Sequence, residues 1–272
     1  MESSIRFADT ILVLPTHGDR MNIAPQSTSF GWLMLGGIII SILLWSRMAK
    51  RDERLLFIYI FALVGAFLGA KIVYLLAEGW LHFGAPDMWL QLATGKTILG
   101  ALLGGYATVE IAKKFLGYRE ATGDRFALVA PVGIIFGRVG CYLHGCCLGT
   151  ICSPAWYSIR DKNGDARWPA VPMEILFNLA AILVFFVLRK QKKLPGQHFH
   201  IYLIAYGIFR FGHEIFRATP KYFGVFSGYQ IAAVCVTILG AVGFVKRRRV
   251  LVVVVRPQTN STIATSSPTS RF

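Results

Sequence analysis

Charged side chains interrupt several long apolar runs of this sequence. Arg138 lies between Gly137 and Val139, and Arg210 and Glu214 lie four residues apart in an aromatic run. A charge at the centre of a bilayer costs about 2.5–3.5 kcal/mol to insert, so such residues usually have a function. Residues at i and i+4 share a helix face, which lets Glu214 hold the guanidinium of Arg210. We therefore expect Arg138 and Arg210 to bind an anion.

Other charged residues in apolar runs admit a simpler interpretation. Each could pair with a neighbour or extend its head group to the membrane interface. For Arg217, near the end of its run, this interpretation is as strong as a functional one, and for Glu110, beside Lys113, we adopt it. Lys71 and Glu174 remain candidate site residues. An anion buried beside apolar helices is most simply a phospholipid headgroup, whose phosphate an arginine binds with two donors.

Four of the five cysteines fall within residues 141–152, and the fifth, Cys235, is expected to pack inside an apolar run. A disulfide between Cys152 and an earlier cysteine, structural thiols, and a role in the lipid site are all open. A metal or redox cluster that includes His144 is a further alternative. Cys146 and Cys147 are adjacent in sequence, which argues against both entering one tetrahedral metal site.

The elements that carry these residues are predicted to be membrane helices. The chain of 272 residues is 54% hydrophobic and only 16% charged, and its mean hydropathy is +0.53. Its apolar runs have the length of transmembrane helices, not the alternating pattern of barrel strands. The fold class is therefore an all-α polytopic membrane protein. The seven candidate spans are 30–45, 55–76, 97–112, 126–143, 171–188, 200–215 and 226–245.

The net charge of +15 reflects topology and does not indicate nucleic-acid binding. Lys and Arg cluster at the ends of apolar runs, with four in each of the segments 47–54, 113–125, 189–193 and 246–249. Because positive loops resist translocation, we expect these segments in the cytoplasm. The N-terminus is then outside and the C-terminus inside.

Three regions follow from this pattern. Residues 1–29 form an external N-terminal arm, which has no signal-peptide pattern. Residues 30–248 form the seven-helix membrane domain. Residues 249–272 form a cytoplasmic tail whose end is rich in Ser and Thr and is expected to be disordered.

Several segments together resemble the prolipoprotein diacylglyceryl transferase family. The segment at 137–149 reads GRVGCYLHGCCLG and keeps the spacing of the family signature. Four more segments agree in order: GAFLGAK at 65–71, PAVPME at 169–174, YGIFRFGHEIFR at 206–217 and GYQ at 228–230.

The resemblance implies transfer of the diacylglyceryl group of phosphatidylglycerol to the lipobox cysteine of a prolipoprotein, in lipoprotein biosynthesis. It implies a multi-pass protein of the bacterial plasma (inner) membrane. Its partners are then phosphatidylglycerol, the prolipoprotein signal peptide and membrane lipids, with no nucleic acid, no cofactor and no metal.

The resemblance also assigns roles to the candidate residues. Arg138 and Arg210 hold the lipid phosphate, Glu214 orients Arg210, and Gly149 allows close approach of the backbone. Lys71, Glu174 and Cys141 contribute to substrate binding.

The candidate base comes from position in the sequence and not from the resemblance. We favour His144, which is close to Arg138 and near the outer interface, over His213, which lies beside Glu214 but projects differently around its helix.

Three positions depart from the family pattern. Leu99 stands where the family has a histidine that is a candidate base, Cys141 replaces an Asn, and Cys146 replaces a Glu. Two alternatives therefore stay open. One is a lipid-binding or lipid-transferring protein with another acceptor, and the other is a membrane thiol-redox or metal protein using the cluster at 141–152.

Overall fold

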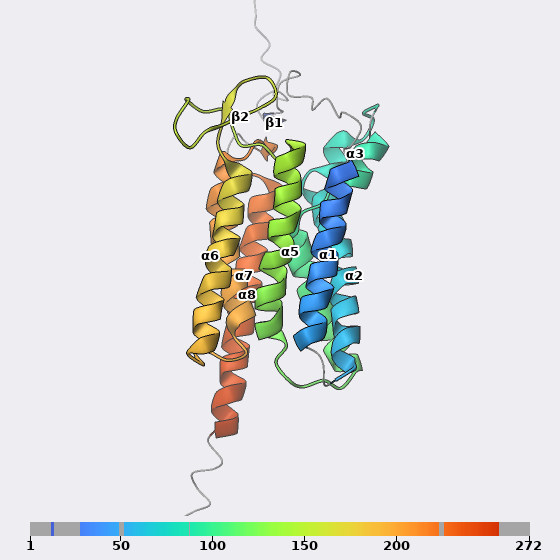
Figure 1. The fold of residues 1–272 in the computed structure, drawn as a ribbon. Helices are drawn as coiled ribbons and strands as arrows, with labels where there is room; N and C mark the ends of the chain where they lie inside the picture. Colours follow the sequence, from blue (N-terminus) through green and yellow to red (C-terminus); the bar gives the residue numbers. More distant parts are fainter. Residues whose placement is uncertain (1–11, 14–27, 49–51, 87, 223–225, 256–272) are drawn as a thin grey trace, which may run out of the picture.

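The protein is described here by a computed structural model, which covers residues 12–13, 28–48, 52–86, 88–222 and 226–255 (Figure 1). Long helices run side by side along one direction, and short connections cap both ends. The helices are α1 (Thr28–Met48), α2 (Arg54–Ala77), α3 (Met88–Thr94), α4 (Ile98–Phe115), α5 (Gly123–His144), α6 (Ala170–Lys190), α7 (His198–His213) and α8 (Gly228–Val255), with the 3-10 helices η2 (Gly79–His82) and η3 (Glu214–Phe216).

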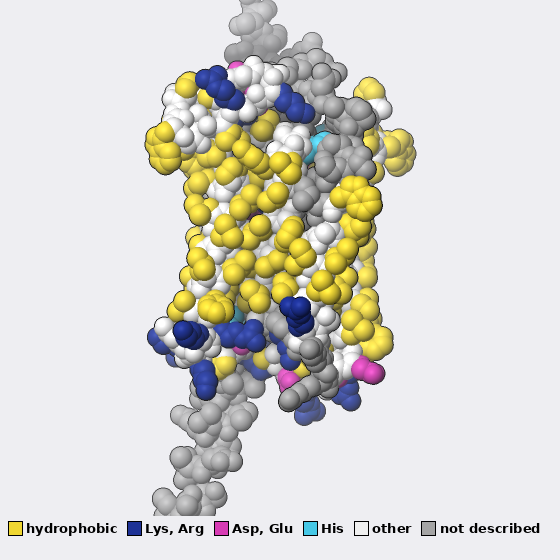
Figure 2. Space-filling view, in the orientation of Figure 1, with side chains coloured by type: hydrophobic (Ala, Val, Ile, Leu, Met, Phe, Trp, Pro, Cys, Tyr) yellow, Lys and Arg dark blue, Asp and Glu magenta, His cyan; other side chains and the backbone are white. Residues whose placement is uncertain are grey.

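The apolar runs form helices because a bilayer offers no water to backbone groups, which must then bond within their own segment. In the described part of the chain, four helices are long and apolar enough to cross a membrane: Arg54–Ala77, Gly123–His144, Ala170–Lys190 and Gly228–Arg248. Figure 2 shows a broad belt of hydrophobic side chains between ends that carry Lys and Arg. The prediction of an all-α membrane protein is confirmed.

All seven predicted segments are helical in the structure, the other three being α1, α4 and α7. That these three also cross the membrane remains a prediction. The sequence did not indicate η2 and α3, which lie between α2 and α4. The membrane domain was expected to end at residue 248, whereas α8 continues to Val255. Most of the predicted arm and residues 256–272 of the predicted tail lie outside the described residues.

Helices α2 and α4 meet through glycines. Gly65 and Gly69 on α2 face Gly100 and Gly104 on α4, so that a Cβ built on Gly104 would lie 2.2 Å from the backbone oxygen of Gly65. Small residues at this spacing let two helix backbones approach closely. These four glycines therefore allow the close packing of α2 against α4.

The connection from α5 to α6 is held against the segment that follows α7. This connection contains the short hairpin of β2 (Ile159–Arg160) and β3 (Ala166–Arg167). Elsewhere in the chain, β1 (Leu12–Val13) pairs with β4 (Lys221–Tyr222), which follows η3. The backbone nitrogen of Thr150 donates to Phe216 (2.9 Å), and the rings of Trp168 and Phe216 stack 4.6 Å apart. The end of α5, the start of α6 and η3 are thus brought to one place.

Candidate functional site

Arg138 and Glu174 form an ion pair between α5 and α6. The Nη2 atom of Arg138 lies 2.9 Å from Oε2 of Glu174, and neither side chain is accessible beyond a few per cent. Charges buried in this way must be paired, because an isolated ion loses its hydration without compensation. The pair places the guanidinium of Arg138 inside the helix bundle, near the end of α5.

A second pair lies at the end of α7, where Nη1 of Arg210 is 2.7 Å from Oε2 of Glu214. The predicted contact between these i and i+4 residues is present. Arg217 then approaches both carboxylates, with 3.8 Å from its Nη1 to Glu174 and 3.7 Å from its Nε to Glu214. Arg217 is only 8% exposed, so it pairs with its neighbours, as one form of the simpler sequence interpretation allowed, and does not extend to the membrane interface.

Neutral hydroxyl groups fix the two carboxylates. Tyr206 donates to Oε1 of Glu174 (2.6 Å), and Thr219 donates to Oε1 of Glu214 (2.6 Å). Behind Glu174, the side chain of Asn178 donates to the Glu174 backbone oxygen (2.8 Å) and accepts from Tyr202 (2.7 Å). Each carboxylate is thereby oriented with one oxygen toward the arginines.

This group of Arg138, Arg210, Arg217, Glu174 and Glu214 is called the arginine cluster below. It contains three cations and two anions. The Nε atoms of all three arginines have no hydrogen-bond partner within the described part of the chain. Buried cationic donors without acceptors favour binding of an additional anion, and a phosphate can accept two of them at once.

Lys221 and Asp161 lie outside the spanning helices, and each has a shifted pKa. Burial lowers the pKa of Lys221, whose Nζ donates to the backbone oxygen of Glu214 at the edge of the arginine cluster. In the hairpin of β2 and β3, a hydrogen bond from Arg167 holds the pKa of Asp161 below its usual range.

Two other predicted site residues, Lys71 and Gly149, contact the backbone of the protein itself. Lys71 donates to the backbone oxygens of Leu92, Ala93 (2.7 Å) and Gly95 (3.1 Å), so it holds the end of α3. Gly149 allows a close approach, but of the protein itself, because a Cβ there would lie 2.2 Å from the backbone oxygen of Trp168.

Three positions bear on the choice of a base, namely Leu99, His144 and His213. Leu99 is fully buried near the start of α4, in the hydrophobic core. His144 is half-buried and is the last residue of α5. His213 stacks on Phe209 with 5.0 Å between ring centroids, and neither of its ring nitrogens has a hydrogen-bond partner among the described residues. His213 therefore lies buried beside Glu214, although the sequence favoured His144.

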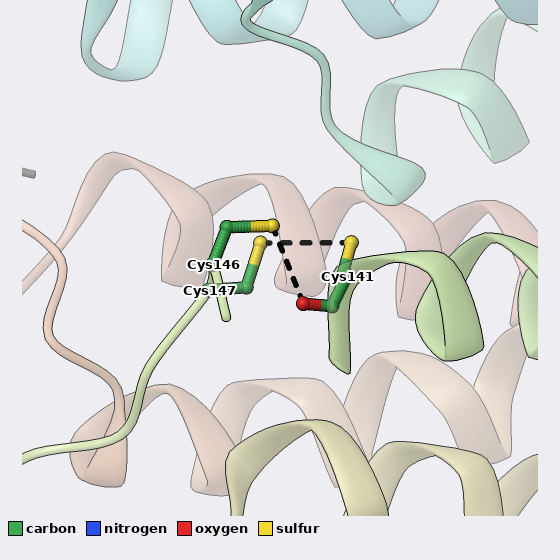
Figure 3. A group of neighbouring side chains, drawn as sticks. All are labelled: Cys141, Cys146 and Cys147. Atoms are coloured by element: carbon green, nitrogen blue, oxygen red, sulfur yellow. Dashed lines mark hydrogen bonds between the residues drawn. The ribbon is translucent and has the colours of Figure 1, made fainter. Parts of the chain in front are cut away.

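The cysteines are all free, so the disulfide considered for Cys152 is absent. The expectation that Cys146 and Cys147 cannot share one site is wrong: the sulfur atoms of Cys141, Cys146 and Cys147 lie within 4.8 Å of one another (Figure 3). Cys147 has a left-handed backbone with φ of 60°, which turns its side chain toward Cys141. Cys235 is exposed on α8 and does not pack in the core of the chain.

The residues that sequence reasoning missed are those that complete the arginine cluster. Arg217 was visible in the run 206–217, but only η3 shows that it turns back into the bundle. Tyr206 and Thr219 gave no separate signal. Tyr206 lies four residues before Arg210, on the same helix face, which could have indicated it.

The fold and the site are those of a helical membrane protein with a buried arginine cluster of three cations and two anions. A model of the family described as prolipoprotein diacylglyceryl transferase matches residues 21–246. The chain belongs to this family.

Similar proteins carry the name phosphatidylglycerol–prolipoprotein diacylglyceryl transferase. One from Campylobacter hominis is 30% identical over 205 residues, which cover 69% of this chain and 73% of that protein. One from Shewanella sp. strain MR-4 is 27% identical over 231 residues, covering 79% and 86%. One from Clostridium tetani is 27% identical over 213 residues, covering 71% and 81%.

Proposed function

We propose that this protein transfers the diacylglyceryl group of phosphatidylglycerol to the lipobox cysteine of prolipoproteins. The observation that carries the proposal is the arginine cluster, in which three buried guanidinium groups face two carboxylates and their Nε atoms have no hydrogen-bond partner among the described residues. Membership of the transferase family supports the choice of reaction.

In this reaction the acceptor sulfur attacks the glycerol carbon that bears the headgroup phosphate. A carbon–sulfur bond forms, the carbon–oxygen bond breaks, and its electron pair goes to the phosphate oxygen as glycerol phosphate leaves. Arg138 and Arg210 bind the phosphate and stabilise the charge that it gains. Glu214 and Glu174 orient the arginines, and Arg217 adds a third cation.

The acceptor thiol must lose a proton before or during attack. His144 is the base that the sequence favours. His213 is a second candidate because its ring is buried beside the arginine cluster and its nitrogens have no hydrogen-bond partner in the described part of the chain.

We also propose the location. The protein is a multi-pass protein of the bacterial plasma (inner) membrane with seven spans, an external N-terminus and a cytoplasmic C-terminus. This places the ends of α5 and α7, and with them the arginine cluster, toward the outer face, where phosphatidylglycerol and the signal peptide are available.

The test is a transfer assay. Purified full-length protein in phosphatidylglycerol vesicles labelled in the diacylglyceryl group is given a lipobox peptide, and mass spectrometry follows the thioether product. Arg138→Ala should lower the rate on the order of 10²-fold, the effect of losing one donor to a developing anion. Arg160→Ala, an exposed arginine of the outer loop, should leave it unchanged. A folded wild-type protein that makes no thioether would refute the transferase assignment.

A second candidate function has a specific observation in its favour. Leu99 replaces the histidine that the resemblance assigns to the base, and it is fully buried among apolar residues. A protein that binds phosphatidylglycerol and serves another acceptor would need no base there. Binding of the labelled lipid that depends on Arg138, without any thioether product, would identify this alternative.

A further inference from the structure

Three cysteine thiols meet beside the arginine cluster. Cys141 lies at the end of α5, and Cys146 and Cys147 lie on the turn that follows (Figure 3). Sγ of Cys147 is 3.9 Å from Sγ of Cys141, and Sγ of Cys146 is 3.6 Å from the backbone oxygen of Cys141. A left-handed conformation costs a residue other than Gly about 1–2 kcal/mol. At Cys147 it brings two adjacent cysteines to one point.

The spacing of the sulfurs fits a shared metal ion. Thiolates bind Zn²⁺ at about 2.3 Å, so two of them on one ion lie about 4 Å apart. The 3.9 Å between Cys141 and Cys147 agrees with this value, whereas a disulfide requires about 2.05 Å. All three donor sulfurs lie within 4.8 Å of one another.

Two cations of the arginine cluster lie near the three cysteines. Arg138 lies three residues before Cys141, on the same face of α5. Arg138 and Arg217 both interact electrostatically with Cys147. Three thiolates and one Zn²⁺ carry a single negative charge, which these two cations offset.

We propose that Cys141, Cys146 and Cys147 bind a zinc ion whose fourth position receives the acceptor thiol. Structural zinc sites have four protein ligands, whereas catalytic sites have three and an open position. The described residues supply three donors here, and each cysteine is partly exposed. This inference rests on the transfer reaction proposed above, and it departs from the expectation that no metal takes part.

The step balances without any oxidation or reduction. The acceptor thiol binds zinc and releases its proton to solvent, because a coordinated thiol is deprotonated. The zinc-bound sulfur then attacks the glycerol carbon, and the electron pair of the broken carbon–oxygen bond leaves with glycerol phosphate, which Arg138 and Arg210 hold. The reaction therefore needs no histidine at the position of Leu99.

The first experiment measures metal content. Full-length protein is purified in detergent with a reductant, and bound zinc is counted by mass spectrometry. Wild type and the controls Cys152→Ser and Cys235→Ser should each hold one equivalent of zinc. When a chelator competes, the variants Cys141→Ser, Cys146→Ser and Cys147→Ser should retain zinc at least tenfold more weakly than wild type. Absence of zinc from the wild type, equal zinc in all variants, or a disulfide within the trio would overturn the inference.

The second experiment tests the open position. The protein is loaded with Co²⁺, whose thiolate charge-transfer absorption reports each sulfur ligand. A lipobox peptide should raise this absorption, and the same peptide with Ser in place of Cys should not. This measurement uses the wild-type chain, so misfolding of a variant cannot imitate the result. An unchanged spectrum would overturn the role of the fourth position.

A transfer assay separates this inference from the proposed function. If zinc-free protein transfers the diacylglyceryl group at the rate of the zinc-loaded protein, the zinc role is wrong and the transferase function stands. If zinc-loaded protein coordinates the peptide thiol but produces no thioether from phosphatidylglycerol, the metal site stands and the proposed reaction is wrong. Loss of transfer on chelation and its return with Zn²⁺ supports both.

Discussion

At the scale of single residues, the site depends on the ion pairs that its arginines and glutamates form. The sequence predicted Arg138, Arg210, Glu174 and Glu214 as site residues, because each is a charge within or beside an apolar run. It predicted the pair Arg210–Glu214 as well, since the spacing of four residues alone brings them together. The pair Arg138–Glu174 joins two helices, so it could be found only from their packing.

Arg217 gives the prediction that belongs to this scale. Removing one partner of a buried charge network costs about 3–5 kcal/mol and leaves the arginine cluster without its surplus cation. Arg217→Ala should therefore lower the Tm and weaken the affinity for phosphatidylglycerol vesicles at least tenfold. Arg217→Lys should recover part of both, because lysine keeps the charge but not the forked geometry. Thermal unfolding and vesicle flotation provide the measurements, and undiminished lipid binding by a folded Arg217→Ala protein would contradict the role.

At the scale of elements, the apolar runs predicted the helices because length and composition suffice for a membrane span. The turn of η3 and the small helix α3 were not predicted, since no periodic pattern marks them. The meeting of Cys146 and Cys147 with Cys141 was also missed. It depends on a left-handed residue that sequence spacing does not reveal.

The contact between α2 and α4 provides a prediction with a neighbouring control. A Cβ on Gly104 would lie 2.2 Å from the Gly65 backbone oxygen, so Gly104→Ala forces two backbones apart. Overpacking of this kind costs about 1–3 kcal/mol. Gly105→Ala places its Cβ 3.5 Å from the oxygen of Ala62, an ordinary contact. Thermal unfolding in detergent should show a lower Tm for the first variant alone, and equal values would exclude a close glycine contact.

The hairpin of β2 and β3 should respond to acid through Asp161, which lies 2.5 Å from Nε of Arg167. Because the pKa of Asp161 in the folded protein is below its ordinary value of 3.8, the pair stabilises the hairpin fully above that value. The contribution is lost as the pH falls through the lower, folded value. Asp161→Asn should thus lower the Tm at pH 7, and the difference from wild type should disappear in strong acid. Asp165→Asn, at an exposed position of the same loop, serves as control and should leave the Tm unchanged. If the Tm difference between Asp161→Asn and wild type persists in strong acid, the ion pair is not its cause.

At the scale of the whole molecule, the proposed topology follows from charge distribution and can be tested by accessibility. In a cysteine-free background, Asn163→Cys should react with an impermeant thiol reagent in intact cells, and Lys192→Cys only after the cells are broken. The physical reason is that the loop at 189–193 is rich in Lys and Arg and resists translocation. If only Lys192→Cys reacts in intact cells, the proposed orientation is inverted. If both variants react in intact cells, no membrane span lies between the two positions.

The pairing within the arginine cluster also bears on the order in which the chain enters the membrane during synthesis. Arg138 is made before Glu174, but its counter-charge lies on α6, the next long helix to emerge. Arg210 finds its counter-charge one turn later in the same segment. An unpaired charge within the bilayer costs about 2.5–3.5 kcal/mol, so early neutralisation shortens the time spent in an unfavourable state. Arg210 can thus be neutralised by a carboxylate of its own segment, and Arg138 by a carboxylate of the next long helix to be synthesised.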